Sequence, residues 1–464
     1  MQSKSVVVLS VVVFMGLASL PVRAQIPASL FGMHMTGGMV NGEPWPVDNT
    51  CTFPLHGCDG FGGISLWDSA VPWTVLNPAD GVYNWRFLDT WMNHAEQNNV
   101  DILYAFGDTP QWASSNPGDR FCADTPPYPP GTCDPPNDLN PDGSGTNQHW
   151  RDFVTAIATH TRGRIHYWEV WDEASNNGKV NGKRVIGQGR WVGTMAQLLR
   201  MTKDARSIIL SIDPTAVILS PSGAITQQSN LNWWASYFSK AGGKYARGID
   251  IHGYVQGYSH GYGTRNGPPI PENLVPMLDA KAGFRSVLAK YGLSKLPLLD
   301  TESSWGVTSQ TGLKDPDEQA GFVVRSFLVH NSENISRFYW YEWDNTKAGT
   351  LWDPNSQTLT KAGTAYQQVQ RWMAGNTASS KCSGPPPPKM GVWTCNFQGA
   401  NGWQAQAVWD MSQKCSNGVC THSNYTFNPT YTQYVTVYGQ VNPTKGSTVQ
   451  IGYQPILLEN KNEP

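Results

Sequence analysis

Two glutamates stand at positions from which they could carry out acid–base and nucleophilic chemistry together. Glu173 closes the largely apolar run that starts at Ile165, and Glu302 closes a similar run that starts at Leu296. A carboxylic acid can donate a proton to a leaving oxygen while a carboxylate attacks an anomeric carbon, so an opposed pair has the chemistry of glycosidic bond cleavage. The alternative for either residue is the cap of a following helix, or a surface pair with lysine.

The elements that must position these glutamates form a repeated α/β pattern. From residue 30 to residue 374, β-type runs alternate with helical patterns at about 43 residues per unit. The predicted strands are Leu30–Met35, Gly63–Asp68, Asp101–Phe106, Ile165–Trp171, Ala216–Ser220, Gly248–Tyr254, Leu296–Glu302 and Ser336–Trp343. The predicted helices are Asn84–Asn98, Trp150–Thr161, Trp191–Ile209, Val275–Tyr291, Asp317–His330 and Ala362–Met373.

Eight such units predict a (β/α)8 TIM barrel, in which the ends of the fourth and seventh strands face each other across the mouth. An open doubly wound sheet would give the same alternation, but no Gly-x-Gly-x-x-Gly follows the first strand.

The barrel is assigned to residues 25–376. Residues 377–391 contain the run Pro385–Pro388 and are predicted to be a linker, and residues 392–464 read as a small all-β domain. We expect this domain to pack on the barrel as a support; an independent sugar-binding module is the alternative.

The first 24 residues have the features of a secretory signal peptide. Lys4 provides a positive start, an apolar run extends from Val6 to Leu20, and Val22-Arg23-Ala24 is a cleavage-type tripeptide. The run is shorter than the roughly twenty residues of a membrane span, although an uncleaved anchor is the alternative. The mature protein is therefore expected outside the cytoplasm, in the extracellular space or the periplasm, and not in the membrane.

Eight cysteines in an exported chain are expected to form disulfide bonds. Local pairing is the simplest of the possible connectivities, and it gives the couples Cys51/Cys58, Cys122/Cys133, Cys382/Cys395 and Cys415/Cys420. A zinc site at the last couple is the alternative, but no surrounding Cys or His spacing supports a metal. No metal and no organic cofactor are predicted.

The composition excludes several classes of protein. With 15% charged and 39% hydrophobic residues, the chain is too apolar to be disordered. Its 33 Lys and Arg balance 35 Asp and Glu, so there is no basic footprint for nucleic acid or for an anionic membrane surface. Twenty tryptophans provide many flat aromatic surfaces.

Several motifs resemble those of clan A glycoside hydrolases, particularly family 39, the β-xylosidases and α-L-iduronidases. Trp168-Glu169-Val170-Trp171-Asp172-Glu173 is similar to the Trp-x-x-Trp-Asn-Glu motif of that clan. Further matching pieces occur in the right order along the barrel: Thr109–Ser114, His252-Gly253-Tyr254, Thr301-Glu302 and Tyr339-Trp340-Tyr341.

The resemblance implies a retaining mechanism with Glu173 as acid/base and Glu302 as nucleophile, their carboxyl groups about 5–5.5 Å apart. Tyr254 matches the tyrosine that hydrogen-bonds the nucleophile, and His252 matches a neighbour that orients the pair. Trp340 matches the tryptophan that stacks on the sugar. For the last three residues the alternative is filling of the barrel interior.

Two positions depart from the family pattern. Asp172 stands where relatives have an asparagine that donates a hydrogen bond to the substrate, and an ionised aspartate can only accept one. Its negative charge is also expected to raise the pKa of Glu173. Ser65 stands where many members of the clan have arginine near the nucleophile. Both changes suggest a shifted substrate.

Four more residues are predicted near the mouth as substrate contacts: His34, Trp67, Trp112 and Trp305. Packing within the barrel or its loops is the alternative for His34, Trp112 and Trp305. The function expected from these observations is an exported retaining glycosidase acting on an oligo- or polysaccharide. A non-catalytic carbohydrate-binding barrel and a transglycosylase are the alternatives. The sequence does not specify the sugar, the linkage or the oligomeric state.

Overall fold

A computed structural model of the chain describes residues 24–36, 61–122, 129–175, 179–180, 183–184, 189–255 and 269–461. The predicted signal sequence, apart from Ala24, lies outside the described residues, as do Cys51 and Cys58. Among the described residues, no helix combines the length and the apolar character needed to span a bilayer.

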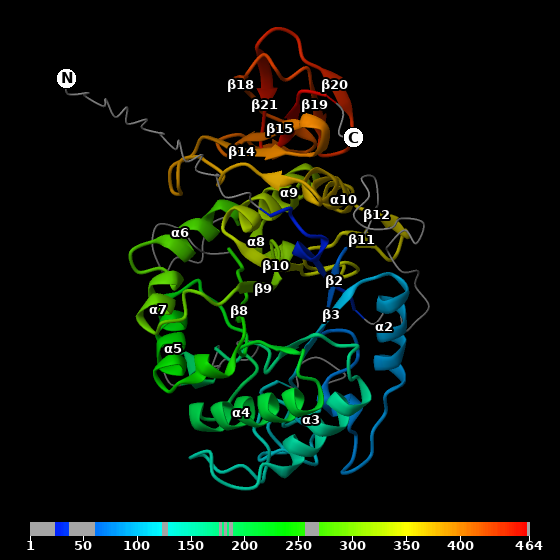
Figure 1. The fold of residues 1–464 in the computed structure, drawn as a ribbon, viewed down its shortest axis with the longest axis vertical. Helices are drawn as coiled ribbons and strands as arrows, with labels where there is room; N and C mark the ends of the chain where they lie inside the picture. The colour runs from blue at the N-terminus through cyan, green and yellow to red at the C-terminus, as the bar shows by residue number, and fades with distance from the viewer. Residues whose placement is uncertain are drawn as a thin grey trace, which may run out of the picture.

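The core of the molecule is an eight-stranded parallel sheet that curls into a barrel (Figure 1). The strands, in chain order, are β1 (Phe31–His34), β2 (Gly63–Leu66), β3 (Asp101–Ala105), β4 (Tyr167–Glu169), β7 (Val217–Ile218), β8 (Ile249–Ile251), β9 (Leu298–Ser303) and β10 (Ile335–Trp340). Neighbouring strands pair in the order β7-β4-β3-β2-β1-β10-β9-β8. A parallel bridge from Leu219 to Gly248 then joins β7 to β8 and closes the barrel. All eight predicted strands are confirmed, and the open doubly wound alternative is wrong.

Helices surround the barrel and bury their apolar faces against it. They are α1 (Trp73–Leu76), α2 (Arg86–Gln97), α3 (Gln148–His160), α4 (Met195–Ile212), α5 (Gln228–Ser239), α6 (Leu274–Asp279), α7 (Phe284–Lys290), α8 (Thr308–Thr311), α9 (Pro316–Ser332) and α10 (Lys361–Met373). The helix predicted over 275–291 is broken into α6 and α7, because the chain becomes extended at Ala280 and Gly283. Helix α5 was not predicted, although its buried residues Leu231, Trp234, Tyr237 and Phe238 recur at helical spacing.

The barrel interior is filled by side chains from alternate strand positions. Trp67, Leu103, Ala105, Leu219, Leu299 and Tyr339 form one buried cluster there. Gly32 in β1 provides the space for the Tyr339 ring, since a Cβ at that position would lie 2.5 Å from a ring carbon. The barrel is therefore a packed core, and its functional surface is expected at the carboxyl ends of the strands.

The C-terminal part of the chain forms a small all-β domain. Its main sheet has the order β13-β14-β15-β22-β19-β20. The strands of the domain are β13 (Thr377–Ala378), β14 (Val392–Gln398), β15 (Gln404–Asp410), β16 (Cys415–Ser416), β17 (Val419–Cys420), β18 (Ser423–Thr426), β19 (Gln433–Thr436), β20 (Val441–Pro443), β21 (Thr448–Ile451) and β22 (Ile456–Glu459). The barrel part of the chain also contains two short hairpins: β5 (Lys179–Val180) with β6 (Lys183–Arg184), and β11 (Trp352–Asp353) with β12 (Thr358–Leu359).

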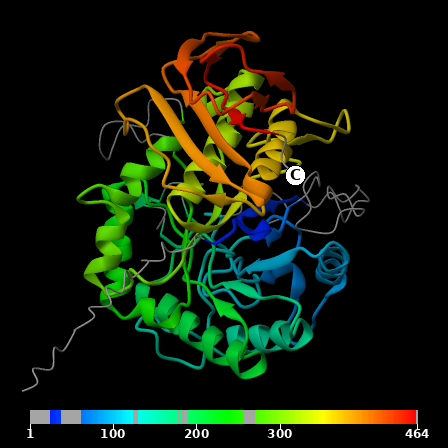
Figure 2. The ribbon, with the colours of Figure 1, turned by 45° about the horizontal axis from the view of Figure 1, so that its top comes forward.

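This domain packs against α9 and α10, as Figure 2 shows. Arg325 of α9 forms an ion pair with Glu272 and lies over the Tyr453 ring, at 4.3 Å from its centroid. Trp409 Nε1 donates to the same Glu272 at 2.7 Å. The packing expected of a supporting domain is therefore observed.

Disulfides join Cys122 to Cys133, Cys382 to Cys395 and Cys415 to Cys420, which confirms three of the four predicted couples and excludes a zinc site at the last of them.

Candidate active site

Glu173 is held at the mouth of the barrel in an unusual backbone conformation. It follows β4 by four residues and has a φ of 45°, in the left-handed region that a non-glycine residue rarely adopts. Its N–H donates to Ser222 Oγ at 2.8 Å, and the preceding N–H, of Asp172, donates to Phe106 O at 2.9 Å. Two neighbouring strand ends thus fix the turn, which aims the carboxyl group away from the regular course of the strand.

Glu302 lies within β9, and its side chain is nearly buried. The exposed fraction of the residue is 8%. The hydroxyl of Tyr254 donates to Glu302 Oε1 at 2.9 Å. Tyr254 follows β8, the neighbour of β9 in the sheet, so adjacent strand ends bring the donor and the carboxylate together.

The imidazole of His252 lies between the two glutamates. Its Nδ1 is 3.4 Å from Glu173 Oε1 and 3.9 Å from Glu302 Oε1. The distance between Glu173 Oε1 and Glu302 Oε1 is therefore no longer than the sum of these two distances. On the other side of the ring, Nε2 is 3.7 Å from Asp172 Oδ1. The structure thus brings together five of the residues singled out in the sequence, namely Asp172, Glu173, His252, Tyr254 and Glu302.

The two glutamates have opposite protonation tendencies. Burial raises the pKa of Glu302 to about 8, against the opposing effect of the His252 charge. The Glu173 side chain is 27% exposed; its partial burial raises its pKa, but the hydrogen bond and the charge of His252, with a contribution from Arg190, bring the pKa below the usual value. The pKa of Glu173 is therefore not raised, contrary to the expectation from its neighbour Asp172, because the hydrogen bond and charge of His252 and the charge of Arg190 outweigh the effect of burial.

Asp172 itself is not an ordinary ionised aspartate. It is 1% exposed, and burial raises its pKa well above the usual value, with the negative charges of Glu302, Glu169 and Glu173 acting in the same direction. A protonated carboxyl can donate a hydrogen bond, as an asparagine amide does. The departure from the family's asparagine therefore changes the site less than the sequence alone suggested.

Sequence analysis missed one cation at the mouth, Arg190. Its NH2 group donates to Asp108 Oδ1 at 2.7 Å, and its Nε is 3.8 Å from Asp172 Oδ2. The guanidinium lies over the Trp67 ring, 4.8 Å from the centroid, so Trp67 is near the mouth as predicted but supports an arginine there. No motif marks Arg190, since it arrives from the long connection after β4.

Ser65 is buried in β2, and its hydroxyl forms no hydrogen bond among the described residues.

The structure places Trp340 and Trp305 away from this cluster. Trp340 is fully buried, its Nε1 donates to Gly349 O at 2.7 Å, and its ring lies 5.3 Å from that of Trp305. Phe327 of α9 packs on the same side of β10. Because side chains alternate along a strand, Tyr339 points into the barrel and Trp340 points toward the helices. Neither tryptophan can stack on a sugar here, which corrects both predictions.

Two further predicted residues have structural partners. Trp112 donates from Nε1 to Asn77 O at 3.0 Å and packs edge-on against His149, so it belongs to loop packing. His34 is 1% exposed and hydrogen-bonds Thr301 O through Nε2 at 2.6 Å. Burial lowers the pKa of His34 to about 3, so its ring is neutral at ordinary pH. Tyr341, which was not singled out alone, lies beside it with the ring centroids 5.2 Å apart.

Two groups of side chains could offer ligands to a metal ion. The donor atoms of Asp172, His252 and Glu302 lie within 4.8 Å of one another, and so do those of Glu169, Asp250 and His252. A histidine must be neutral to bind a metal. The surrounding carboxylates, led by Glu302, raise the pKa of His252 well above the usual value despite its burial.

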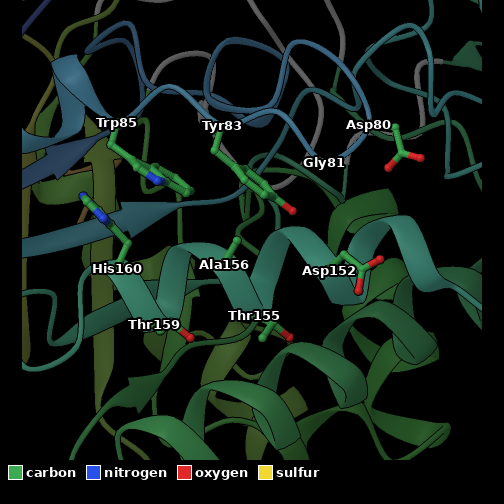
Figure 3. A pocket seen from close by; sticks show the side chains of 9 residues that line it. All are labelled: Asp80, Gly81, Tyr83, Trp85, Asp152, Thr155, Ala156, Thr159 and His160. Atoms are coloured by element: carbon green, nitrogen blue, oxygen red, sulfur yellow. The ribbon is translucent and has the colours of Figure 1, made fainter.

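A separate groove lies on the outer side of the barrel, between helix α3 and the segment that leads into α2 (Figure 3). In it the Trp85 ring stacks with Tyr83 at 5.2 Å and with His160 at 4.8 Å. His160 Nε2 also lies 2.6 Å from Asp89 Oδ1. These rings pack on one another, and none of the described residues around His252 lines this groove.

No protein-family model and no curated protein matches the sequence. Solved structures do resemble the fold. A family 39 glycoside hydrolase from Bacteroides cellulosilyticus matches with a TM-score of 0.58 and 15% identity, over 86% of this chain and 75% of that one. A glucosidase from Croceicoccus marinus matches with a TM-score of 0.56 and 13% identity, over 94% and 96% of the two chains.

The catalytic domain of the GH30 xylanase C from Talaromyces cellulolyticus is similar too, with a TM-score of 0.55 and 13% identity, over 93% of this chain and 98% of that domain. At such low identities these likenesses concern the fold. They show that the chain has the barrel architecture of family 39 and family 30 glycoside hydrolases, which confirms the resemblance first drawn from its motifs.

Proposed function

We propose that this protein is a retaining glycoside hydrolase that cleaves O-glycosidic bonds in an oligo- or polysaccharide. The observation that carries the proposal is the approach of Glu173 and Glu302 to a single nitrogen of His252, at 3.4 and 3.9 Å, at the carboxyl ends of barrel strands. Two carboxyl groups facing one small space are what the double-displacement mechanism requires. The fold shared with glycoside hydrolases from two families supports the same activity.

In the first step, Glu302 is the nucleophile and Glu173 the general acid. Glu302 Oε1 forms a bond to the anomeric carbon while the bond to the leaving oxygen breaks, and the proton of Glu173 passes to that oxygen. In the second step, Glu173 removes a proton from water, and the resulting hydroxide displaces Glu302 from the sugar. Tyr254 donates a 2.9 Å hydrogen bond to Glu302 and stabilises the carboxylate form of that side chain, both as it attacks and as the ester is released.

In the resting protein, the proton shared by the two glutamates lies on Glu302, although the first step needs it on Glu173. Because the pKa of Glu302 is raised to about 8 and that of Glu173 is lowered, the proton resides on Glu302 at neutral pH. The reactive form arises when this proton moves to Glu173. His252 contacts both carboxyl groups through Nδ1, so its imidazole can relay the proton between them.

The setting of the enzyme is proposed from the sequence. A signal peptide at residues 1–24 would export the chain, and three disulfides in the described residues fit an oxidising compartment. The substrate is then a glycan outside the cytoplasm, and Arg190, whose side chain is 22% exposed at the mouth, is a group available to contact it.

Covalent trapping tests the proposal. Purified protein is incubated with a panel of cyclitol epoxides and 2-deoxy-2-fluoro glycosyl fluorides of several sugar configurations, and labelled peptides are mapped by mass spectrometry. We expect one equivalent of label on Glu302, none in Glu302→Ala, and unchanged labelling in the surface control Glu96→Gln, whose side chain is 51% exposed. Absence of label across the panel, together with absence of activity on plant and bacterial glycans, would favour a carbohydrate-binding barrel. A product formed with inverted configuration would refute the retaining mechanism.

A further inference from the structure

The backbone between His252 and Tyr254 is held by a side chain of the neighbouring strand. The N–H of Gly253 donates to Asp300 Oδ1 at 3.0 Å, and Asp300 is fully buried in β9. The last paired position of β8 lies opposite Asp300, so this carboxyl continues the hydrogen bonding beyond the end of the regular pairing. Asp300 precedes Glu302 by two residues. One side chain therefore connects the strand of Glu302 to the backbone between the two residues that contact it.

Asp300 is itself held on its other oxygen. Its Oδ2 lies 2.8 Å from Nε2 of His330 in α9 and accepts from Ser303 Oγ at 3.2 Å. His330 is 3% exposed, its Nδ1 donates to Ser326 O at 2.7 Å, and its ring stacks on Phe338 with the centroids 3.7 Å apart. The bond-cleavage steps described above use none of these groups. Because hydrogen bonds and packing fix both Asp300 and His330, the carboxyl that faces the backbone beyond β8 has one defined position.

The contact between Asp300 and Gly253 leaves no room for a side chain on the glycine. A Cβ at position 253 would lie 3.0 Å from Cγ of Asp300 and closer still to Oδ2. The preceding N–H, of His252, donates to Gly223 O at 3.0 Å, in the segment after β7. The backbone at His252 and Gly253 is thus held from both neighbouring strand ends, and on the β9 side the anchor is a carboxyl group.

We propose that Asp300 is a positioning residue for the two side chains that contact Glu302. It holds the N–H of Gly253, which lies between them in the chain. The Tyr254 hydroxyl then stays 2.9 Å from Glu302 Oε1, and His252 Nδ1 stays 3.9 Å from the same atom. Without the carboxyl of Asp300, the hydroxyl and the imidazole lose this common anchor. The effect on catalysis rests on the proposed function, whereas the anchoring of Gly253 does not.

Hydrogen exchange tests the anchoring in the full-length protein without substrate. Exchange of the amide at position 253 is followed by mass spectrometry with electron-transfer fragmentation, in the wild type, Asp300→Ala and Asp300→Asn, with helix α3 as the internal reference for an intact fold. We expect the wild-type amide to be protected, and Asp300→Ala to exchange at least about tenfold faster at this position, since the amide loses its acceptor. Asp300→Asn should stay within about threefold of the wild type, because its amide oxygen can accept from Gly253 and its NH2 group can donate to Nε2 of a neutral His330.

Fast exchange at position 253 in the wild type, or equal rates in the two variants, would overturn the proposal. If Asp300→Ala does not fold, Gly253→Ala is the second perturbation, because its Cβ displaces the carboxyl of Asp300. We expect this variant to show the same rise in exchange, and protection equal to that of the wild type would count against the anchor.

A double-mutant cycle with Tyr254→Phe tests the effect on catalysis. On a glycan that the protein cleaves, Asp300→Ala should lower kcat/KM about tenfold and move the basic limb of its pH dependence upward, because the Glu302 carboxylate loses its hydrogen bond. In the Tyr254→Phe background, where that bond is already absent, the same substitution should lower kcat/KM by less than about threefold. Equal losses in both backgrounds would show a general structural effect and overturn the positioning role. If no glycan is cleaved, the proposed function fails, and the exchange rates alone decide on Asp300.

Discussion

The hydrogen bond from Tyr254 to Glu302 provides the sharpest kinetic prediction. Tyr254→Phe removes the hydroxyl and leaves the ring, so the packing beside β9 is preserved. The lost bond runs to a nearly buried carboxyl that must be ionised for attack. A hydrogen bond to a charged group contributes about 1.5–3 kcal/mol. At about 1.4 kcal/mol per pH unit, the pKa of Glu302 should rise by about one to two units from its value of about 8.

This rise has two consequences for the dependence of kcat/KM on pH. Between the pKa values of Glu173 and Glu302 the pair holds one proton, and a constant fraction of molecules has it on Glu173, the reactive arrangement. That fraction falls tenfold for each unit by which the two values move apart. We therefore expect a 10- to 100-fold lower plateau in Tyr254→Phe, together with a basic limb displaced from about pH 8 to about pH 9–10.

The assay measures reducing sugar released from an unactivated glycan, identified by screening, from pH 4 to pH 10. Melting temperature is recorded in parallel at each pH to separate kinetics from unfolding. A variant with reduced activity but an unmoved basic limb would show that the limb does not report Glu302. A variant with an unchanged plateau would show that the hydrogen bond does not stabilise the reacting carboxylate.

Three further outcomes are expected. Glu173→Ala should lose activity on unactivated glycans but slowly cleave an aryl glycoside with a good leaving group. The rate of this cleavage should rise with pH to a midpoint below 8, because loss of the Glu173 charge lowers the pKa of Glu302. Turnover of glycans at the wild-type rate would exclude Glu173 as the acid. Asp172→Asn should change kcat/KM at pH 7 by less than about threefold, because burial raises the pKa of Asp172 and an asparagine amide can donate the hydrogen bond of a neutral carboxyl; a large gain on ordinary β-glycosides would contradict this reasoning. The pKa of His34 is about 3 in the folded protein and 6.5 in the unfolded chain, so the wild type is destabilised by proton uptake of the unfolded chain as pH falls below 6.5. The free energy of unfolding of His34→Gln, measured by denaturation, should therefore rise by about 2 kcal/mol relative to that of the wild type between pH 7 and pH 5. A difference that stays constant with pH would contradict the low pKa.

Local sequence patterns were sufficient for the architecture and for the position of the two candidate glutamates. All eight barrel strands were predicted, because each is a short apolar β-type run bounded by turn residues, and the helical patterns between them have their own period. Glu173 and Glu302 could be singled out because each closes such a run, and parallel barrel strands end at one face. Three of the four predicted cysteine couples are confirmed, because cysteines close in sequence need only a short loop to meet.

The choice of Trp340 shows where a residue type misleads. The triplet Tyr339-Trp340-Tyr341 contains three aromatic rings, and the tryptophan was chosen by its match to a motif. Strand alternation places Tyr339 inside the barrel and Trp340 against α9, and the next residue, Tyr341, reaches the mouth beside His34. The register of β10 against its neighbours decides this, and register is a property of the assembled sheet.

Charge and protonation at the site were decided only by the tertiary structure. Arg190 reaches Asp108 from a position 82 residues away, and His34 meets Thr301 across 267 residues. The pKa of Asp172 is raised because the fold buries it among other carboxyl groups, and the pKa of Glu173 is lowered, against its burial, because the fold places His252 and Arg190 beside it. Composition determines which titratable groups exist, but burial and distance set their pKa values, and both arise only when distant strands close into one barrel.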